Sequence, residues 1–114
     1  MKTSVLQVAY YPALLHIRQQ MLEDAGYNVV SALGNDQGMS IAAAQEFDVV
    51  VVGFSGPHSD RSRMVRWLKQ HSPKTPVVAL LARETEHFPD ADCETLSEDP
   101  RVWLAALAAC ITRA

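Results

Sequence analysis

Asp48-Val49-Val50-Val51-Val52-Gly53 is the stretch of sequence that decides the fold. Its four consecutive valines show no polar alternation, which is typical of a strand that is covered on both faces of a parallel sheet. Pro76–Leu81 (PVVALL) is a second continuous apolar run of the same kind. The sequence therefore predicts a parallel sheet with Asp48–Gly53 as its central strand and helices on both of its faces.

Strand and helix patterns alternate outward from this segment to both ends of the chain. Towards the N-terminus we expect a strand over Ser4–Tyr10, a helix with apolar residues at Leu14, Ile17, Met21 and Ala25 and an end at Gly26, a strand over Asn28–Ala32, and a helix that Gly34, Asn35 and Asp36 open and that runs to about Phe47. Towards the C-terminus we expect a helix with Met64, Trp67, Leu68 and His71, a strand over Pro76–Leu81, a weak strand over Cys93–Leu96, and a last helix with Asp99 as N-cap and Pro100 at its first position. This alternation predicts right-handed crossovers and a doubly wound α/β sheet.

The composition is that of a globular protein and excludes several classes of function. Of 114 residues, 48% are hydrophobic and 20% are charged, and we expect residues 1–114 to form a single domain. A net charge of −3 without a Lys/Arg cluster argues against nucleic acid as a direct partner. No apolar run approaches the roughly 20 residues of a membrane span, and no signal-peptide pattern follows Met1, so we expect a cytoplasmic protein. Cys93 and Cys110 lack CxxC spacing and are expected to be thiols rather than metal ligands.

Several stretches together resemble the receiver domains of two-component signalling, which are chemotaxis-regulator-like domains. The matching stretches are Val5–Val8 before Pro12, Leu22–Val29, Asp48–Val52, Pro57 after Gly53, Ser72–Val78, and Ala91-Asp92. The resemblance implies a flavodoxin-like five-stranded parallel sheet with strand order 2-1-3-4-5. Receivers carry a helix between strands 4 and 5, but only Ala82–Asp92 separates these strands here and Pro89 interrupts the stretch, so we expect that helix to be shortened or absent.

The resemblance also shows which chemical groups this chain lacks. Receivers place two acidic residues after strand 1, a phosphoryl-accepting Asp after strand 3, a Ser or Thr after strand 4 and a Lys after strand 5. The corresponding positions here hold Ala9 and Tyr10, Gly53, Leu81, and one of Ser97, Glu98 or Asp99, depending on the alignment register. No lysine follows Lys74. We therefore expect no phosphorylation, no Mg²⁺, no other metal and no cofactor, and we expect Tyr10 and Leu81 to pack over Gly53 and fill the vacated site.

Three other polar groups have both a functional and a simpler interpretation. They are Ser55, His58 and Asp60 in one loop, the acidic residues Asp90, Asp92 and Glu94, and the basic residues Arg61, Arg63, Arg66 and Lys69. The first could be a catalytic set but is typical of a turn and a helix start. The second could bind a hard cation but lacks the spacing of a calcium loop. The third could contact an acidic protein but is typical of a solvated helix face.

These observations favour a phosphorylation-independent, receiver-like signalling module that is not an enzyme and acts by protein–protein interaction in a two-component or phosphorelay-related pathway. The alternative is a small ligand-binding domain or enzyme that reuses the crevice at the carboxyl ends of the strands, with Tyr10, Ser55 and His58 as polar groups. Because strand Val77–Leu81 is apolar on both faces, its second face must be covered. Either the following loop folds Phe88 inward, or a protein partner or second copy docks near Leu80, Phe88, Cys93 and Trp103.

Overall fold

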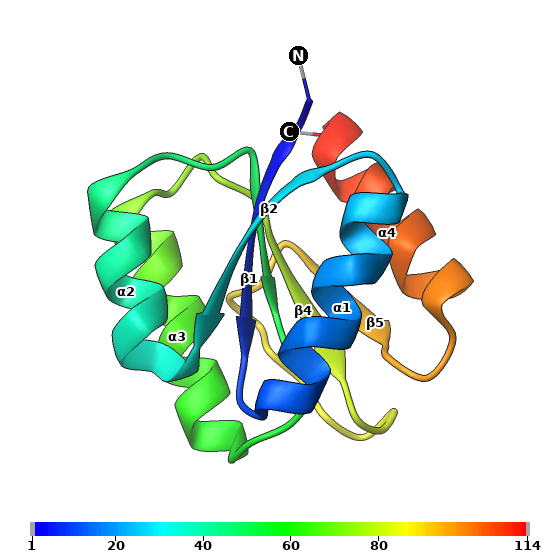
Figure 1. The fold of residues 1–114 in the computed structure, drawn as a ribbon. Coiled ribbons are helices and arrows are strands. Elements are labelled where there is room, and N and C mark those ends of the chain that lie inside the picture. The colour runs from blue at the N-terminus through cyan, green and yellow to red at the C-terminus, as the bar shows by residue number, and fades with distance from the viewer. Residues whose placement is uncertain (1, 114) are drawn as a thin grey trace.

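The computed structural model describes residues 2–113 and has five parallel strands in the order β2-β1-β3-β4-β5 (Figure 1). The strands are β1 (Ser4–Ala9), β2 (Asn28–Leu33), β3 (Val49–Val52), β4 (Val77–Leu81) and β5 (Cys93–Leu96). The helices are α1 (Pro12–Asp24), α2 (Gly34–Ala44), α3 (His58–His71) and α4 (Pro100–Arg113). The predicted doubly wound fold and its strand order are confirmed. Within the described range, no helix is long and apolar enough to cross a membrane.

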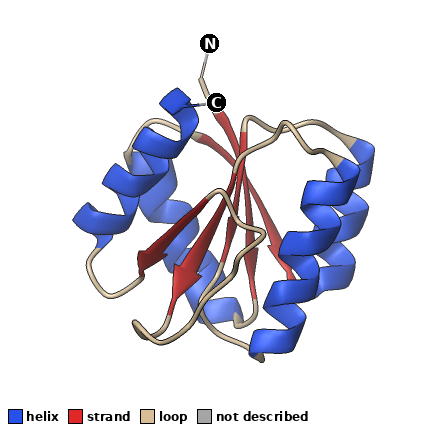
Figure 2. Ribbon diagram, turned by 180° about the vertical axis from the view of Figure 1, so that it is seen from behind, coloured by secondary structure: helices blue, strands red, loops and turns tan. Residues whose placement is uncertain are grey.

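Two helices cover each face of the sheet, α2 and α3 on one side and α1 and α4 on the other (Figures 1 and 2). The pleat of β3 divides its valines between the two cores: Val50 and Val52 pack on the α2/α3 side, while Val49 and Val51 pack on the α1/α4 side. All four valines are buried. The run without polar residues is therefore explained by helices on both faces.

Gly26 ends α1 in the way that the sequence predicts. Its φ is 98°, in the left-handed region that favours glycine. The Tyr27 amide donates to the Leu22 carbonyl at 3.1 Å, and the Gly26 amide donates to the Glu23 carbonyl at 2.9 Å. These two bonds form a Schellman motif, which satisfies carbonyls at the end of the helix.

The predicted bounds of α2 are wrong at its C-terminal end, and the expected cap is different. The helix ends at Ala44, because Gln45 adopts an extended conformation, and Phe47 lies in the α2/α3 core outside the helix. No side chain caps the first turn. Asn35, which we expected to help cap it, uses its side chain to join Tyr10 to α3 instead.

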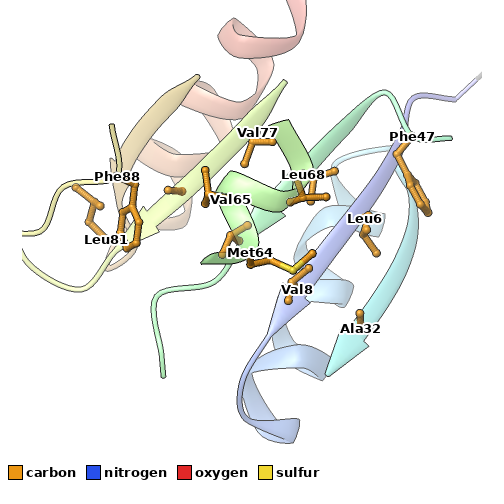
Figure 3. Close-up of a cluster of buried hydrophobic side chains, with 13 residues drawn as sticks. Leu6, Val8, Ala32, Phe47, Met64, Val65, Leu68, Val77, Leu81 and Phe88 are labelled. Atoms are coloured by element: carbon orange, nitrogen blue, oxygen red, sulfur yellow. The ribbon is translucent and has the colours of Figure 1, made fainter. Parts of the chain in front are cut away.

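No helix connects β4 to β5, and residues 82–92 form a loop that covers the α3 side of β4 together with α3. Phe88 points inward from this loop and is 2% exposed, next to Leu81 in Figure 3. Leu80 and Trp103 are buried in the opposite core, at 0% and 3% exposure. Of the two predicted covers for the second face of β4, the loop that folds Phe88 inward is confirmed, and the chain itself buries the side chains of Leu80, Phe88 and Trp103. Cys93 is partly buried and Cys110 is buried, and neither forms a disulfide bond.

Basic residues of α3 hold this loop in place. Arg61 forms an ion pair with Glu86, Arg66 with Asp90 at 3.8 Å, and Lys69 with Asp92 at 2.8 Å. The three partners follow one another along the loop in the same order as the basic residues along the helix. The predicted basic row, which we interpreted as a solvated face or a contact for an acidic protein, is therefore largely paired within the chain.

The acidic residues near β5 likewise make intramolecular contacts. Asp92 accepts hydrogen bonds from Lys69 Nζ at 2.8 Å and from the Val77 amide at 2.7 Å. Glu94 accepts one from the Phe88 amide at 2.8 Å and lies 2.8 Å from His87 Nδ1. Among residues 2–113, no group of three or more His, Cys, Asp or Glu side chains could hold a metal ion.

Replacement of Phe88 by alanine tests how much the loop contributes to stability. The substitution removes the side chain that covers the α3 side of β4, so we expect Phe88→Ala to lower the free energy of unfolding by about 3–5 kcal/mol. Urea denaturation monitored by circular dichroism measures the change. Val102→Ala, at a position that is 52% exposed, is the control and should change stability by less than about 0.5 kcal/mol. Equal effects of the two substitutions would contradict this account of the loop.

The Glu86 carboxylate should make part of the loop's stabilising effect depend on pH. Burial by itself would raise the pKa of Glu86, but hydrogen bonds from Arg61 and the Ala82 amide, with the charge of Arg61, hold that pKa below its ordinary value. The folded state therefore binds this proton less readily than the unfolded chain. The stabilisation is present at neutral pH and is lost as the pH falls below about 4. We expect Glu86→Gln to be less stable than the parent at pH 7 and the difference to shrink in acid. The exposed Glu84→Gln should show no such trend.

Candidate functional site

The carboxyl ends of β1, β3 and β4 meet at one edge of the sheet, where ligands bind in proteins of this architecture. Ala9 ends β1, Gly53 follows β3 and donates its amide to the Val8 carbonyl at 2.8 Å, and Leu81 ends β4. None of these three side chains carries an oxygen or nitrogen atom. This part of the edge therefore supplies no carboxylate ligand for a divalent cation and no nucleophile.

Tyr10 packs toward α2 and α3 and joins their N-terminal ends. Its hydroxyl donates to Asn35 Oδ1 at 2.7 Å, and Asn35 Nδ2 donates to the Asp60 carbonyl at 2.9 Å. The ring lies against Gly56, where an added β-carbon would be 2.8 Å from Tyr10 Cγ. Burial raises the pKa of the Tyr10 hydroxyl well above its ordinary value, so the phenol is neutral and acts as a hydrogen-bond donor.

The prediction that Tyr10 and Leu81 pack over Gly53 is wrong, and the reason is the pleat of the strands. Leu81 packs in the α2/α3 core, and Tyr10 packs against that same core. Gly53 follows Val52, which faces the α2/α3 core, so a β-carbon on Gly53 points to the opposite face. Such an atom would lie 2.9 Å from Arg18 Nη1. The group beside Gly53 is therefore a guanidinium.

Arg18 is a functional candidate that the sequence analysis missed. It lies on the sheet-facing side of α1, one turn before Leu22, and is 5% exposed. Its Cζ lies 5.6 Å from the centre of the Phe54 ring, an arrangement typical of a cation–π contact. Burial lowers the pKa of Arg18 to about 10, so it remains charged at neutral pH. Its position between Leu14 and Leu22, at the spacing of an apolar helix face, is the signal that could have found it.

A buried glutamine on β1 fixes α1 against the sheet and so positions Arg18. Gln7 Nε2 donates to the Leu15 carbonyl at 2.7 Å and to Ser31 Oγ at 2.8 Å. Ser31 Oγ in turn donates to Gln19 Oε1 at 2.8 Å. The network connects α1, β1 and β2. Within the described chain, Gln7 Oε1 is buried and accepts no hydrogen bond.

The backbone after β5 places Ser97 and Asp99 in different surroundings. The Ser97 amide donates to the Leu81 carbonyl at 3.1 Å, so Ser97 is the residue that continues the strand beside β4. Asp99, which we placed among the candidates for this position, lies instead at the start of α4. Its carbonyl accepts bonds from the Val102 and Trp103 amides, and its carboxylate accepts one from the Arg101 amide at 3.0 Å. The prediction that Asp99 caps the last helix is confirmed.

Ser55, His58 and Asp60 do not form a catalytic arrangement. The His58 ring stacks on Phe88 with centroids 4.5 Å apart, and its Nε2 lies 3.0 Å from the His87 carbonyl oxygen. No hydrogen bond joins Ser55 to His58 in residues 2–113. His58 therefore helps to hold the loop between β4 and β5 rather than to activate a nucleophile.

Comparisons with known proteins support the fold through solved structures. No protein-family model and no curated protein matches the chain. The chemotaxis response regulator CheY4 of Vibrio cholerae is 20% identical, with 96% of this chain and 99% of that chain covered and a TM-score of 0.84. A CheY-like response regulator receiver domain from Methanospirillum hungatei is 16% identical, with 99% and 96% covered and a TM-score of 0.86.

A third similar structure contains a partner. It is the complex of the histidine kinase ThkA with the response regulator TrrA from Thermotoga maritima, where the identity is 15%, the coverage 96% of this chain and 98% of that chain, and the TM-score 0.83. At such identities the likeness establishes the fold. The chain thus has the fold of a response-regulator receiver domain.

A pair of substitutions at Gly53 tests the position and charge of Arg18. Aspartate and asparagine at this position cause the same crowding, including that against the Val8 carbonyl, but only aspartate can form an ion pair with Arg18. We expect Gly53→Asp to be more stable than Gly53→Asn at pH 7 by about 1–3 kcal/mol, measured by urea denaturation. The difference should disappear when Arg18→Met is added to both variants. Equal stabilities in the parent background would mean that the guanidinium does not face position 53.

Proposed function

We propose that this chain is a phosphorylation-independent, receiver-like signalling module that acts by binding a protein partner in a two-component or phosphorelay-related pathway. The observation that carries the proposal is the edge formed by Ala9, Gly53 and Leu81, which has the backbone of a receiver site without its chemical groups. Phosphoryl transfer needs a nucleophile and positive charge placed to neutralise the transferred group. Gly53 offers no nucleophile.

The charge at this edge also argues against acylphosphate chemistry that uses a metal. Mg²⁺ binds oxygen ligands in near-octahedral geometry, commonly with carboxylates among them. The fixed charge beside Gly53 is the Arg18 guanidinium, which repels a divalent cation. The absence of an acidic pair and the presence of a buried arginine therefore both disfavour Mg²⁺ binding at this edge.

A protein partner is supported by the fold and by one similar structure. TrrA is bound to a histidine kinase in its complex, so a domain of this fold can present a surface to a signalling protein. The loop at residues 82–92 is pinned by ion pairs and by Phe88, which gives this chain a fixed surface there. A fixed surface suits a module whose output does not depend on a covalent switch. A homodimer and a different partner are both outcomes that size-exclusion chromatography with light scattering distinguishes.

Intact-mass spectrometry tests the proposal directly. We expect no phosphoryl adduct after incubation with acetyl phosphate and Mg²⁺, while an active receiver domain treated in parallel becomes phosphorylated. Gly53→Asp alone should also remain unmodified, because its carboxylate pairs with Arg18 and no acidic ligands for Mg²⁺ are restored. A stable adduct on the parent chain would overturn the proposal. An adduct on Gly53→Asp would overturn the assigned role of Arg18.

A further inference from the structure

Arg18 is a buried cation whose donors are not used within the described chain. A guanidinium carries five N–H donors, and burial of a charge is unfavourable unless partners replace the lost water. No hydrogen bond or ion pair joins Arg18 to any group in residues 2–113, and its one ring contact, with Phe54, uses the face of the guanidinium rather than its donors. Burial is the sole cause of its lowered pKa, so no neighbouring carboxylate offsets the charge.

The other buried arginine, Arg61, differs from Arg18 because its donors have partners within the chain. The Arg61 side chain is 4% exposed. It forms an ion pair with Glu86, and its Nε donates to the Gly56 carbonyl at 3.1 Å. The two buried arginines therefore differ: the partners of Arg61 lie within the chain, and the donors of Arg18 have none there.

The guanidinium nitrogens of Arg18 keep some exposure to solvent. Although the residue is 5% exposed, none of its nitrogen atoms is among the fully buried atoms that lack a partner, so these nitrogens account for part of the exposed area. Side chains on a helix lean toward its N-terminus, which carries the guanidinium to the carboxyl edge of the sheet beside Gly53. Ala9 and Gly53, which lie at this edge, add no polar side-chain group beside the guanidinium.

The first turn of α1 adds to the positive potential at this edge. The helix begins at Pro12, and no side chain caps it at Tyr11. The amides of its first turn and the helix dipole place partial positive charge on the same side of the sheet as the guanidinium. Phe54 and Ser55 follow Gly53 in the adjoining loop, and their amides donate to no acceptor in residues 2–113. A helix N-terminus alone attracts anions weakly, but here it accompanies a buried arginine whose donors are unused.

We propose that Arg18, assisted by the N-terminus of α1, binds a small oxyanion of the phosphate type at the carboxyl edge of the sheet between β1 and β3. The planar guanidinium matches two oxygens of such an anion, and charge-assisted hydrogen bonds of this kind are among the strongest in proteins. Binding is non-covalent and needs neither a nucleophile nor a metal ion. It does not depend on the partner proposed above.

Two-dimensional ¹H–¹⁵N NMR with inorganic phosphate as the probe tests the site on the full chain. Phosphate is added at constant ionic strength by exchange for chloride. We expect saturable shift changes centred on Gly53, Phe54, Ser55 and the first turn of α1. Changes centred on the exposed arginines of α3, or changes that do not saturate, would overturn the proposal, since both indicate loose association with surface charge.

Thermal unfolding of matched variants provides the second readout. Arg18→Met should weaken phosphate binding by about tenfold or more, because both fork-like hydrogen bonds are lost. Arg63→Met removes the same charge from an exposed position on α3, 64% exposed in its side chain, and should leave binding unchanged. Phosphate also stabilises proteins by exclusion from their surfaces. The rise in Tm of the Arg18→Met variant in the same buffers measures this nonspecific contribution.

Two results decide the outcome of the thermal experiment. A phosphate-dependent rise in Tm that is larger for the parent than for Arg18→Met supports the site, and equal rises overturn it. Should Arg18→Met fail to fold, Arg18→Lys keeps the charge without the planar fork and should bind phosphate more weakly than the parent. Equal binding by the lysine variant would show that a point charge suffices and would contradict recognition by the guanidinium.

Discussion

Burial of both faces of β3 and β4 is the constraint on which the rest of this structure depends. Every residue of these two strands is buried, so each face needs a complete cover of side chains. The α1/α4 pair covers one face along its whole length. On the other face α2 and α3 cover β1 and β3, and the region above β4 is covered by α3 together with the loop at residues 82–92. The conformation of that loop is therefore a requirement of the core and not a free surface feature.

This chain has no helix between β4 and β5, and a single aromatic ring and a row of ion pairs take its place. Phe88 supplies apolar area, and His58 and Arg61 lie against its ring. Partly buried ion pairs contribute little net stability, because desolvation offsets much of their attraction. The pairs from α3 to the loop are better understood as fixing its path, so that Phe88 reaches the core. We therefore expect the Phe88 ring to provide most of the loop's contribution to stability and the ion pairs to determine where the loop lies.

The sequence predicted those features that depend on local pattern. The apolar runs located the buried strands, Gly26 ended α1, and Asp99 opened α4, because each effect is determined within a few residues. The wrong expectations concerned side-chain direction. Tyr10 and Gly53 each follow a strand by one residue, and the pleat sends them to opposite faces once the register of Val8 with Val52 is known. That register is a long-range property, and the sequence alone did not supply it.

Arg18 shows why the candidate site was only half predictable. The absence of carboxylates, a hydroxyl and a lysine from the edge could be inferred from single positions, because the identity of a residue shows which groups it lacks wherever its side chain points. The group that lies beside Gly53 belongs to a different element, because the long side chain of Arg18 reaches from α1 to the end of β3. A charge on an apolar helix face is a local conflict, and such conflicts persist when function or another part of the fold compensates for them. Arg61 is compensated by Glu86 within the fold, whereas the compensation of Arg18 must come from solvent or from a bound anion.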